Sequence, residues 1–305
     1  MTGADAPLVS VCVPVYNGEA TLARALDSLL AQDIDTDAVE IVVCDNASTD
    51  GTAAICADYA ARDPRIRVHR NPRNLGLAGN YNRTVELARG RYVKWATHDD
   101  WHDPRSLRLT AEALEANPEA SLCATGVSWV DEHGVEFDRW VPSADLLSPA
   151  PHERVRRVLR TMGETHPMYG LLRTDALRRT HRMRSFVGSD RTLIAEMALQ
   201  GPIVQLPDVL HFYTVSRTAR TGYRPSLTYD PANRERLPLR TWRLIYEHLE
   251  VVWRSDLGPV HKATVSATVL RRFAVGDARR LAAEAYHSSR ILGSRAARWR
   301  PRSAV

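Results

Sequence analysis

The sequence has 305 residues, enough for one large domain with an appendage or for two modest domains. Hydrophobic residues make up 44%, charged residues 25%, and the net charge is +5, which is ordinary for a globular chain and excludes wholesale disorder. The longest apolar stretch, Leu8 to Val15, is much shorter than the roughly 20 residues of a membrane span, and the N-terminus has no secretory-signal pattern, so we expect a cytoplasmic protein.

Apolar strands alternate with helical patterns through the first half of the chain. Short apolar runs predict strands at 8–15, 39–44, 66–69 and 92–96, with helical patterns between them, and a longer run predicts another strand at 121–130. Strands separated by helices of roughly 10–15 residues are typical of βαβ units. We therefore expect an α/β fold with a mixed, mainly parallel sheet flanked by helices.

The second half of the chain is less regular until its helical end. A helix is predicted over 190–200, a last strand near 209–214, and helices again beyond residue 237. These patterns divide the chain into three parts, which are an α/β domain over 1–215, a surface loop over 216–236 and a helical extension over 237–305.

Polar residues gather directly after three of the predicted strands. The runs are Tyr16 to Glu19, Asp45 to Asp50 and Thr97 to Asp100. In an open parallel sheet, ligands bind outside the carboxyl ends of the strands, so we expect the three clusters to face one cleft. Taken alone, each of the first two clusters is explained as well by turn formation and helix capping.

The adjacent carboxylates of Asp99 and Asp100 indicate a metal. They repel each other unless a cation, a ligand or water screens them. Hard divalent cations such as Mg²⁺ or Mn²⁺ are bound by a few carboxylate oxygens together with substrate phosphates. The pair therefore predicts a divalent metal with a diphosphate, and hydration of the two carboxylates is the alternative.

Four segments, taken in order, resemble the inverting family 2 glycosyltransferases, which have the GT-A fold. They are Val9 to Asn17, Glu40 to Thr52, Asn74 to Ala78 with Asn80 and Asn82, and Lys94 to Asp100. The resemblance covers roughly residues 8–215. It implies the transfer, with inversion, of a sugar from a nucleoside-diphosphate sugar to an acceptor hydroxyl.

The resemblance also implies roles for single residues. Asp45 would accept a hydrogen bond from the base, and Asp99 would reach a Mn²⁺ or Mg²⁺ ion that bridges the two phosphates of the donor. The other residues implied in nucleotide-sugar binding are Pro14, Tyr16, Asn17, Glu19, Asn74, Gly76, Thr97 and His98.

One position departs from the D-x-D pattern of the family. Thr97 stands where the first acid is expected, and one fewer negative charge predicts weaker metal binding. A branch of the family carries an HDD ending similar to the run from His98 to Asp100, and we interpret the chain as that subtype. Asn46 stands where the family pattern has the second acid of the second cluster, and this is a milder change than Thr97.

An inverting transfer also needs a base that takes the proton of the acceptor hydroxyl. The family's catalytic acid typically lies in a loop such as Gly188 to Arg191, and Asp190 is our candidate for this residue. The alternative is that Asp190 only caps the predicted helix that runs to Gln200.

Four more residues are candidates for contacts with the acceptor or the diphosphate, namely Asp100, Tyr169, Arg217 and Arg220. Tyr169 lies in a segment that resembles the family's acceptor side, and core packing is the alternative. The guanidinium groups of the two arginines suit phosphate geometry, and a solvated basic loop is the alternative. His211, at the end of the last strand, is a weaker candidate for a metal ligand.

The C-terminal extension is basic. From residue 231 onward, 15 Lys and Arg residues stand against six Asp and Glu residues. A basic amphipathic helix can lie on an anionic membrane surface, which predicts peripheral contact with the inner face of the membrane. A helical cap on the catalytic domain, or on a second subunit of a homodimer, is the alternative. No nucleic-acid partner is expected, because the charges lack an aromatic platform and a binding motif.

The predicted function is metal-assisted glycosyl transfer to a glycan, a lipid-linked sugar or a small natural product. A catalytically silent nucleotide-sugar or carbohydrate-binding module is one alternative, and Thr97 favours it. A nucleotidyltransferase is the other, although it would ordinarily carry a Gly-rich basic loop in place of Tyr16 to Glu19. A dehydrogenase is excluded, because no G-x-G-x-x-G follows the first strand.

Overall fold

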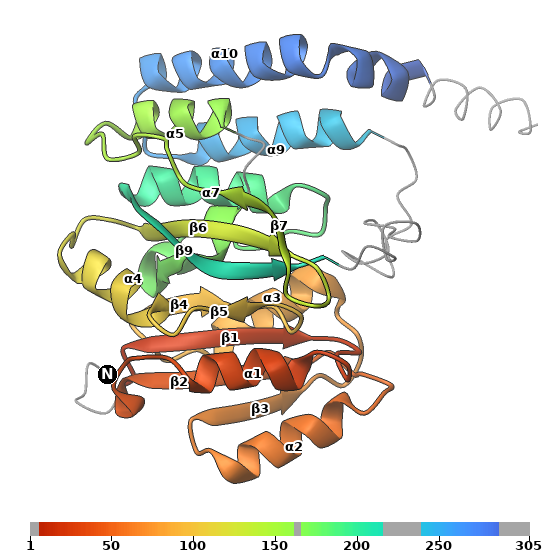
Figure 1. Ribbon diagram of the computed structural model, residues 1–305. Coiled ribbons are helices and arrows are strands. Elements are labelled where there is room, and N and C mark those ends of the chain that lie inside the picture. The colour runs from red at the N-terminus through yellow and green to blue at the C-terminus, as the bar shows by residue number, and fades with distance from the viewer. Residues whose placement is uncertain (1–5, 162–165, 216–238, 287–305) are drawn as a thin grey trace, which may run out of the picture.

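The computed structural model describes residues 6–161, 166–215 and 239–286. Nine strands form one mixed sheet in the order β3-β2-β1-β4-β8-β6-β9-β5, and β7 pairs with β6 (Figure 1). The strands are β1 (Val9–Val15), β2 (Val39–Asp45), β3 (Ile66–Arg70), β4 (Tyr92–Trp95), β5 (Trp101–His102), β6 (Leu122–Val130), β7 (Glu136–Trp140), β8 (Leu171–Arg173) and β9 (Ile203–Thr214).

Most of the strands run in one direction. The pairs β1–β2, β2–β3, β1–β4 and β6–β9 are parallel, whereas β5, β7 and β8 pair antiparallel with their neighbours. The predicted α/β fold with a mainly parallel sheet is therefore confirmed. A consequence is that the carboxyl ends of β1, β2, β4 and β9 lie at the same edge of the sheet.

Helices surround the sheet and extend from one end of it. They are α1 (Leu22–Leu30), α2 (Thr52–Arg62), α3 (Gly76–Leu87), α4 (Ser106–Glu115), α5 (Pro151–Arg160), α6 (Thr174–Arg178), α7 (Ser189–Gln200), α9 (Arg240–Arg254) and α10 (Pro259–Gly276), with short 3₁₀ turns η1 (Thr36–Ala38) and η2 (His166–Tyr169). In Figure 1 the long helix α10 lies at the end of the molecule opposite to α2.

Both faces of the sheet are buried, as the continuous apolar runs predict. Val9, Val11 and Val13 of β1 face a core that includes α1, α2 and α4, whereas Cys12 faces a second core that includes α3 and α7. Alternate side chains of a strand point to opposite faces, so a strand covered on both sides must be apolar throughout.

The C-terminal helices continue the second core. Leu244 and Val252 of α9 and Val269 and Phe273 of α10 are buried in the same cluster as Leu193 of α7. The extension therefore packs as a cap on the α/β part of the same chain, in contact with α5 and α7. Of the helices in the described ranges, none has the length and apolarity to cross a bilayer. Peripheral membrane contact and a homodimer remain predictions.

Two elements go beyond what the sequence patterns predict. No helix is predicted over residues 151–160, where the structure has α5; Pro151 occupies the first turn, where proline is well tolerated. The last strand is longer than predicted and begins at Ile203 rather than near Val209. Its first residues, 203–205, pair with residues 122–124 of β6. This pairing extends the strand beyond the segment that the apolar pattern predicts.

Candidate functional site

The strand order β2-β1-β4 places the three polar clusters side by side. In the register of the sheet, Val15 lies beside Asp45 and Cys12 lies beside Trp95. The backbone N–H of Ala96 continues the ladder by donating to Cys12 (2.9 Å). The loops after the three strands therefore leave the sheet at one edge, where they contact one another.

Hydrogen bonds join the loop after β1 to the loop after β2. The backbone N–H of Asn17 donates to Ser48 Oγ (2.9 Å), and the N–H of Thr49 donates back to Asn17 Oδ1 (2.9 Å). Asn17 has a φ of +52°, a left-handed conformation that asparagine tolerates better than most residues. The Gly18 N–H donates to Thr52 Oγ1 (2.8 Å). The Asn17 side chain thus holds the two loops together.

The other predicted residues of the first cluster differ in accessibility. Tyr16 is 43% exposed and is available to a ligand. Glu19 is exposed and accepts a hydrogen bond from the Gly51 N–H (3.0 Å). Pro14 is buried within β1, beside Cys44 of β2. A contact between Pro14 and a base remains a prediction, and its burial favours a supporting position behind Tyr16.

Asp45 is buried and already paired. It is 1% exposed, its Oδ1 accepts from the Ser48 N–H (2.8 Å), and its Oδ2 accepts from Arg70 (2.5 Å). Arg70 lies at the end of β3, in register with Asp45, and also donates to the Ser48 carbonyl (2.8 Å). Arg70 is not among the residues predicted from the sequence, because strand register, and not a local pattern, brings it beside Asp45.

Asn46 is the centre of a buried amide network. Its Nδ2 donates to Asn74 Oδ1 (2.9 Å) and to the Gly76 carbonyl (3.3 Å), and its Oδ1 accepts from the Leu75 N–H (2.9 Å) and from Asn71 Nδ2 (3.1 Å). A carboxylate has no hydrogen to donate, so an acid at this position loses two of the four bonds. This gives a physical reason for asparagine where relatives carry an acid.

The third cluster contacts the first cluster and β9. His98 Nδ1 lies 3.1 Å from Thr21 Oγ1, and Arg24 donates both to the Asp99 carbonyl (3.0 Å) and to Thr214 Oγ1 (2.8 Å). A Cβ added at Gly18 would lie 3.0 Å from His98 Nδ1, so the close approach of these loops requires a residue without a side chain.

The two adjacent carboxylates have different surroundings. Asp100 is 1% exposed and accepts hydrogen bonds from His211 Nε2 (2.9 Å), from the Thr214 N–H (2.9 Å) and from the Thr97 hydroxyl. Asp99 is only half-buried. Burial, and then the neighbouring charge of Asp100, raise the pKa of Asp99. In the structure the Asp100 carboxylate is bonded to Thr97, His211 and Thr214. A contact between Asp100 and the acceptor or the diphosphate remains a prediction.

The residues at this edge fit a metal ion that takes most of its coordination from the phosphates of a bound nucleotide and from water. Across the described ranges, no group of three or more His, Cys, Asp and Glu residues is placed to enclose an ion. Mg²⁺ and Mn²⁺ in nucleotide sites ordinarily use one or two carboxylates and complete their coordination with phosphates and water. Asp99 can supply that carboxylate. His211 contacts Asp100 through Nε2, and its Nδ1 is buried without a hydrogen-bond partner among the described residues, so a role as a metal ligand stays a prediction.

Tyr169 lies behind the acidic pair. Its ring packs edge-on against His211, with 5.1 Å between the ring centroids, and its carbonyl accepts from Lys94 Nζ (2.6 Å). Lys94 is fully buried, and burial lowers the pKa of its ammonium group to about 8. A sugar contact of Tyr169 remains a prediction. Arg217 and Arg220 lie outside the described residues.

Asp190 lies in the first turn of α7, two residues after the N-cap position. The N-cap residue is Gly188, whose φ of +96° suits glycine, and it provides no side-chain hydrogen bond to the helix. Asp190 is half-buried, and the Arg191 N–H donates to its Oδ1 (2.9 Å). The start of α7 packs near η2, which carries Tyr169. Asp190 thus binds a backbone N–H of the first turn without occupying the N-cap position, and its role as base stays a prediction.

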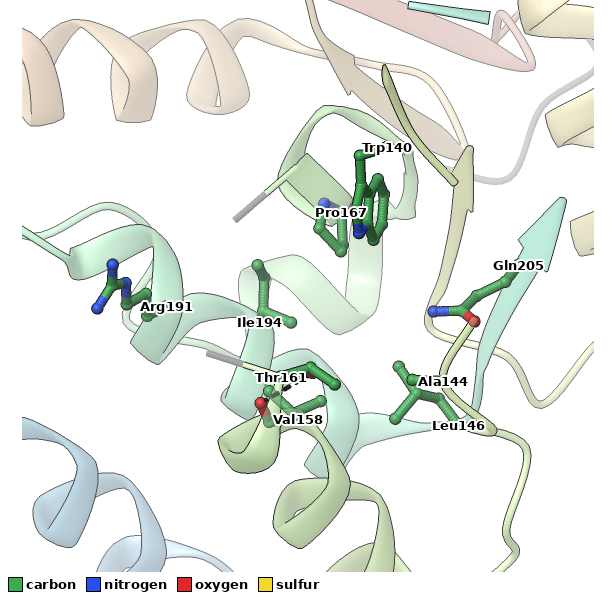
Figure 2. Close-up of a pocket in the computed structure, with 9 residues that line it drawn as sticks. All are labelled: Trp140, Ala144, Leu146, Val158, Thr161, Pro167, Arg191, Ile194 and Gln205. Carbon is green, nitrogen blue, oxygen red and sulfur yellow. Dashed lines mark hydrogen bonds between the residues drawn. The ribbon is translucent and has the colours of Figure 1, made fainter. Parts of the chain in front are cut away.

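A small cavity lies beside the α7 segment that follows Asp190. In Figure 2, Trp140 and Pro167 lie on one side of it, Val158 and Thr161 lie on the opposite side, and Ile194 of α7 comes between them. Its volume of about 20 Å³ is enough for a water molecule and too small for a sugar ring. This cavity is not the cleft predicted for the donor.

The fold is that of a GT-A glycosyltransferase scaffold, a mostly parallel α/β sheet flanked by helices. The family model for "Glycosyl transferase family 2" matches residues 10–180, and the chain belongs to this family.

Two curated relatives illustrate the family. EpsE of Bacillus subtilis, named as a glycosyltransferase, is 38% identical over 138 residues, which are 45% of this chain and 49% of EpsE. Chondroitin synthase of Pasteurella multocida is 30% identical over 137 residues, which are 40% of this chain and 14% of the synthase. The chain thus spans half or less of the length of these relatives.

Solved structures show the same fold at low identity. TarS of S. aureus in complex with UDP-GlcNAc is 21% identical, with a TM-score of 0.66 over 87% of this chain and 72% of that one. The mannosyltransferase PcManGT of Pyrobaculum calidifontis, in complex with GDP-Man and Mn²⁺, is 19% identical, with a TM-score of 0.54 over 98% of this chain and 82% of that one. At these identities the likeness concerns the fold.

Proposed function

We propose that the protein transfers a glycosyl group, with inversion, from a nucleoside-diphosphate sugar to an acceptor hydroxyl. The observation that carries the proposal is the meeting of the loops after β1, β2 and β4 with the end of β9 at Thr214, at the edge of the sheet that carries the half-buried Asp99. Family membership and the nucleotide-sugar complexes of TarS and PcManGT support it.

Each group in this site has a proposed task. Tyr16, Asn74 and Gly76 contact the nucleoside and the diphosphate. Asp45, already paired with Arg70, offers its remaining acceptor capacity to the base. Asp99 holds a Mg²⁺ or Mn²⁺ ion, whose chemistry is to neutralise the charge on the leaving diphosphate.

The bond changes follow from inversion. The acceptor oxygen forms a bond to the anomeric carbon while the bond from that carbon to the diphosphate oxygen breaks, and the nucleoside diphosphate leaves. The Asp190 carboxylate takes the proton of the acceptor hydroxyl, which typically contributes 10²–10⁴-fold to the rate. The acceptor class remains open among glycans, lipid-linked sugars and small natural products.

A catalytically silent nucleotide-sugar-binding protein is the second candidate. Two observations favour it, namely Thr97 in place of an acid and the lack, in the described part of the chain, of a preformed cluster of metal ligands. Such a protein would bind the donor without breaking the bond to the diphosphate.

A donor panel and one variant distinguish the two functions. UDP-, GDP- and dTDP-sugars with Mn²⁺ are tested for binding by calorimetry and for release of the nucleoside diphosphate. For the enzyme, Asp190→Asn should retain donor affinity and reduce transfer by about 10²–10⁴-fold. Donor binding without release by the unsubstituted protein, across a panel of acceptor hydroxyls, would indicate the silent module; unaltered transfer by Asp190→Asn would place the base elsewhere.

A further inference from the structure

A second candidate binding site lies between α5 and α10, at the end of the molecule that Figure 1 shows opposite to α2. It is a groove with a volume of about 490 Å³. We name it the arginine groove, and its lining residues are Arg156, Arg160, Thr268, Arg271, Arg272, Val275 and Gly276. None of these residues belongs to the strand edge proposed for the donor.

The arginines of α5 divide into two sets. Arg154 donates to the Ala198 carbonyl (2.7 Å), and Arg157 pairs with Asp145, so both are used by the fold. Arg156 and Arg160, four residues apart, share the helix face that lines the groove. Neither forms an ion pair with a residue in the described ranges, and Arg156 Nε is buried without a hydrogen-bond acceptor.

The opposite wall of the groove is also positive. Thr268, Arg271, Arg272 and Val275 follow the spacing of one helix face. Arg272 contacts Asp277 at 3.5 Å, whereas Arg271 is exposed and has no ion-pair partner in the part of the chain that the structure describes. The 18 residues of α10 include no acid. Four guanidinium groups thus face one space that no carboxylate lines.

A bound anion would offset the repulsion among these charges. Planar guanidinium groups bind phosphate oxygens in pairs and lose less hydration than ammonium groups when they do so. The groove also has an apolar edge, because Val275, one of its lining residues, is 78% exposed. An anion with hydrocarbon beside it matches both features.

We propose that the arginine groove binds the phosphate headgroups of an anionic phospholipid surface, with Val275 against the acyl region. Charge argues against a second copy of this groove as the occupant, since two such surfaces would bring arginines together. The proposal does not depend on the proposed transferase activity, because the groove and the donor site share no residue.

Vesicle flotation tests the proposal with the full chain. Phosphatidylcholine vesicles with phosphatidylglycerol should bind the protein, and phosphatidylcholine alone should not. The double variant Arg156→Gln, Arg271→Gln should bind about 30-fold more weakly, since each basic side chain near an anionic surface contributes about fivefold. Neither arginine has an ion-pair partner in the described structure, so the variant should unfold at the temperature of the unsubstituted protein.

The matched control is Arg62→Gln, Arg139→Gln. It removes the same charge from two exposed arginines that lie outside the groove and pair with Asp58 and Glu136. An equal loss of binding in both double variants would overturn the proposal in favour of general surface charge. Binding of soluble pyrophosphate without vesicle binding, or a dimer that dissociates in the groove variant, would also overturn it. Donor binding should be the same in all these proteins.

Discussion

The two neighbouring acids Asp99 and Asp100 provide a sharp test of the site. The structure predicts that Asp99→Asn removes metal-dependent donor binding and leaves the fold intact, whereas Asp100→Asn destabilises the fold. The reason is that Asp99 is half-buried near the ligand edge, while Asp100 is 1% exposed and ties β9 to the loop after β4.

The magnitude follows from the three hydrogen bonds that Asp100 accepts. An asparagine can keep one or two of them, because its amide NH₂ group replaces either the oxygen that accepts from Thr214 or the oxygen that accepts from His211 and Thr97. Hydrogen bonds to a charged group contribute about 1.5–3 kcal/mol each, so we expect a loss of about 3 kcal/mol. This corresponds to a fall in Tm of roughly 6–12 °C. Asp99→Asn should change stability by less than about 1 kcal/mol.

Thermal unfolding without ligand measures the first effect, and calorimetry with a nucleoside diphosphate and Mn²⁺ measures the second. The two variants change the same charge at adjacent positions and are each other's control. Undiminished donor binding by Asp99→Asn would refute its role as a metal ligand. An unchanged Tm for Asp100→Asn would refute the assignment of Asp100 to the framework.

Three more predictions concern buried polar groups. Asn46→Asp loses two donated hydrogen bonds and should lower the free energy of unfolding by about 2 kcal/mol in urea titrations; equal stability would contradict the amide network. Burial raises the pKa of Glu40, but hydrogen bonds from Ser10, Arg67 and Arg89 outweigh it and hold that pKa below 4.5. Glu40→Gln should therefore be less stable than the unsubstituted protein at pH 7, and the gap should close as the pH falls below 4.5; a gap that persists at pH 3 would refute this. Burial lowers the pKa of Lys94 to about 8, so the unfolded chain holds a proton that the folded chain releases between pH 8 and 10.5. As the pH rises across that range, the free energy of unfolding of the unsubstituted protein should increase by up to about 3 kcal/mol relative to that of Lys94→Met. Parallel plots of unfolding free energy against pH for the two proteins would refute the lowered pKa.

The sequence by itself determined the layout of the α/β part. Continuous apolar runs such as the one ending at Val15 predict strands buried on both faces, and parallel strands bring the polar residues that follow them to one edge. These conclusions depend on local pattern and on chain direction, and both are read from the order of residues. The polar clusters that include Asp45 and Asp99 therefore lie where the pattern placed them.

Only the tertiary structure decided which polar group each side chain contacts. Asp100 meets His211 across 111 positions of the chain, and Arg24 meets Thr214 across 190. The arginine groove likewise arises because α10 packs beside α5. With 41 basic residues in the sequence, residue type cannot select these partners. Strand register and helix rotation select them, and both depend on how the whole core packs.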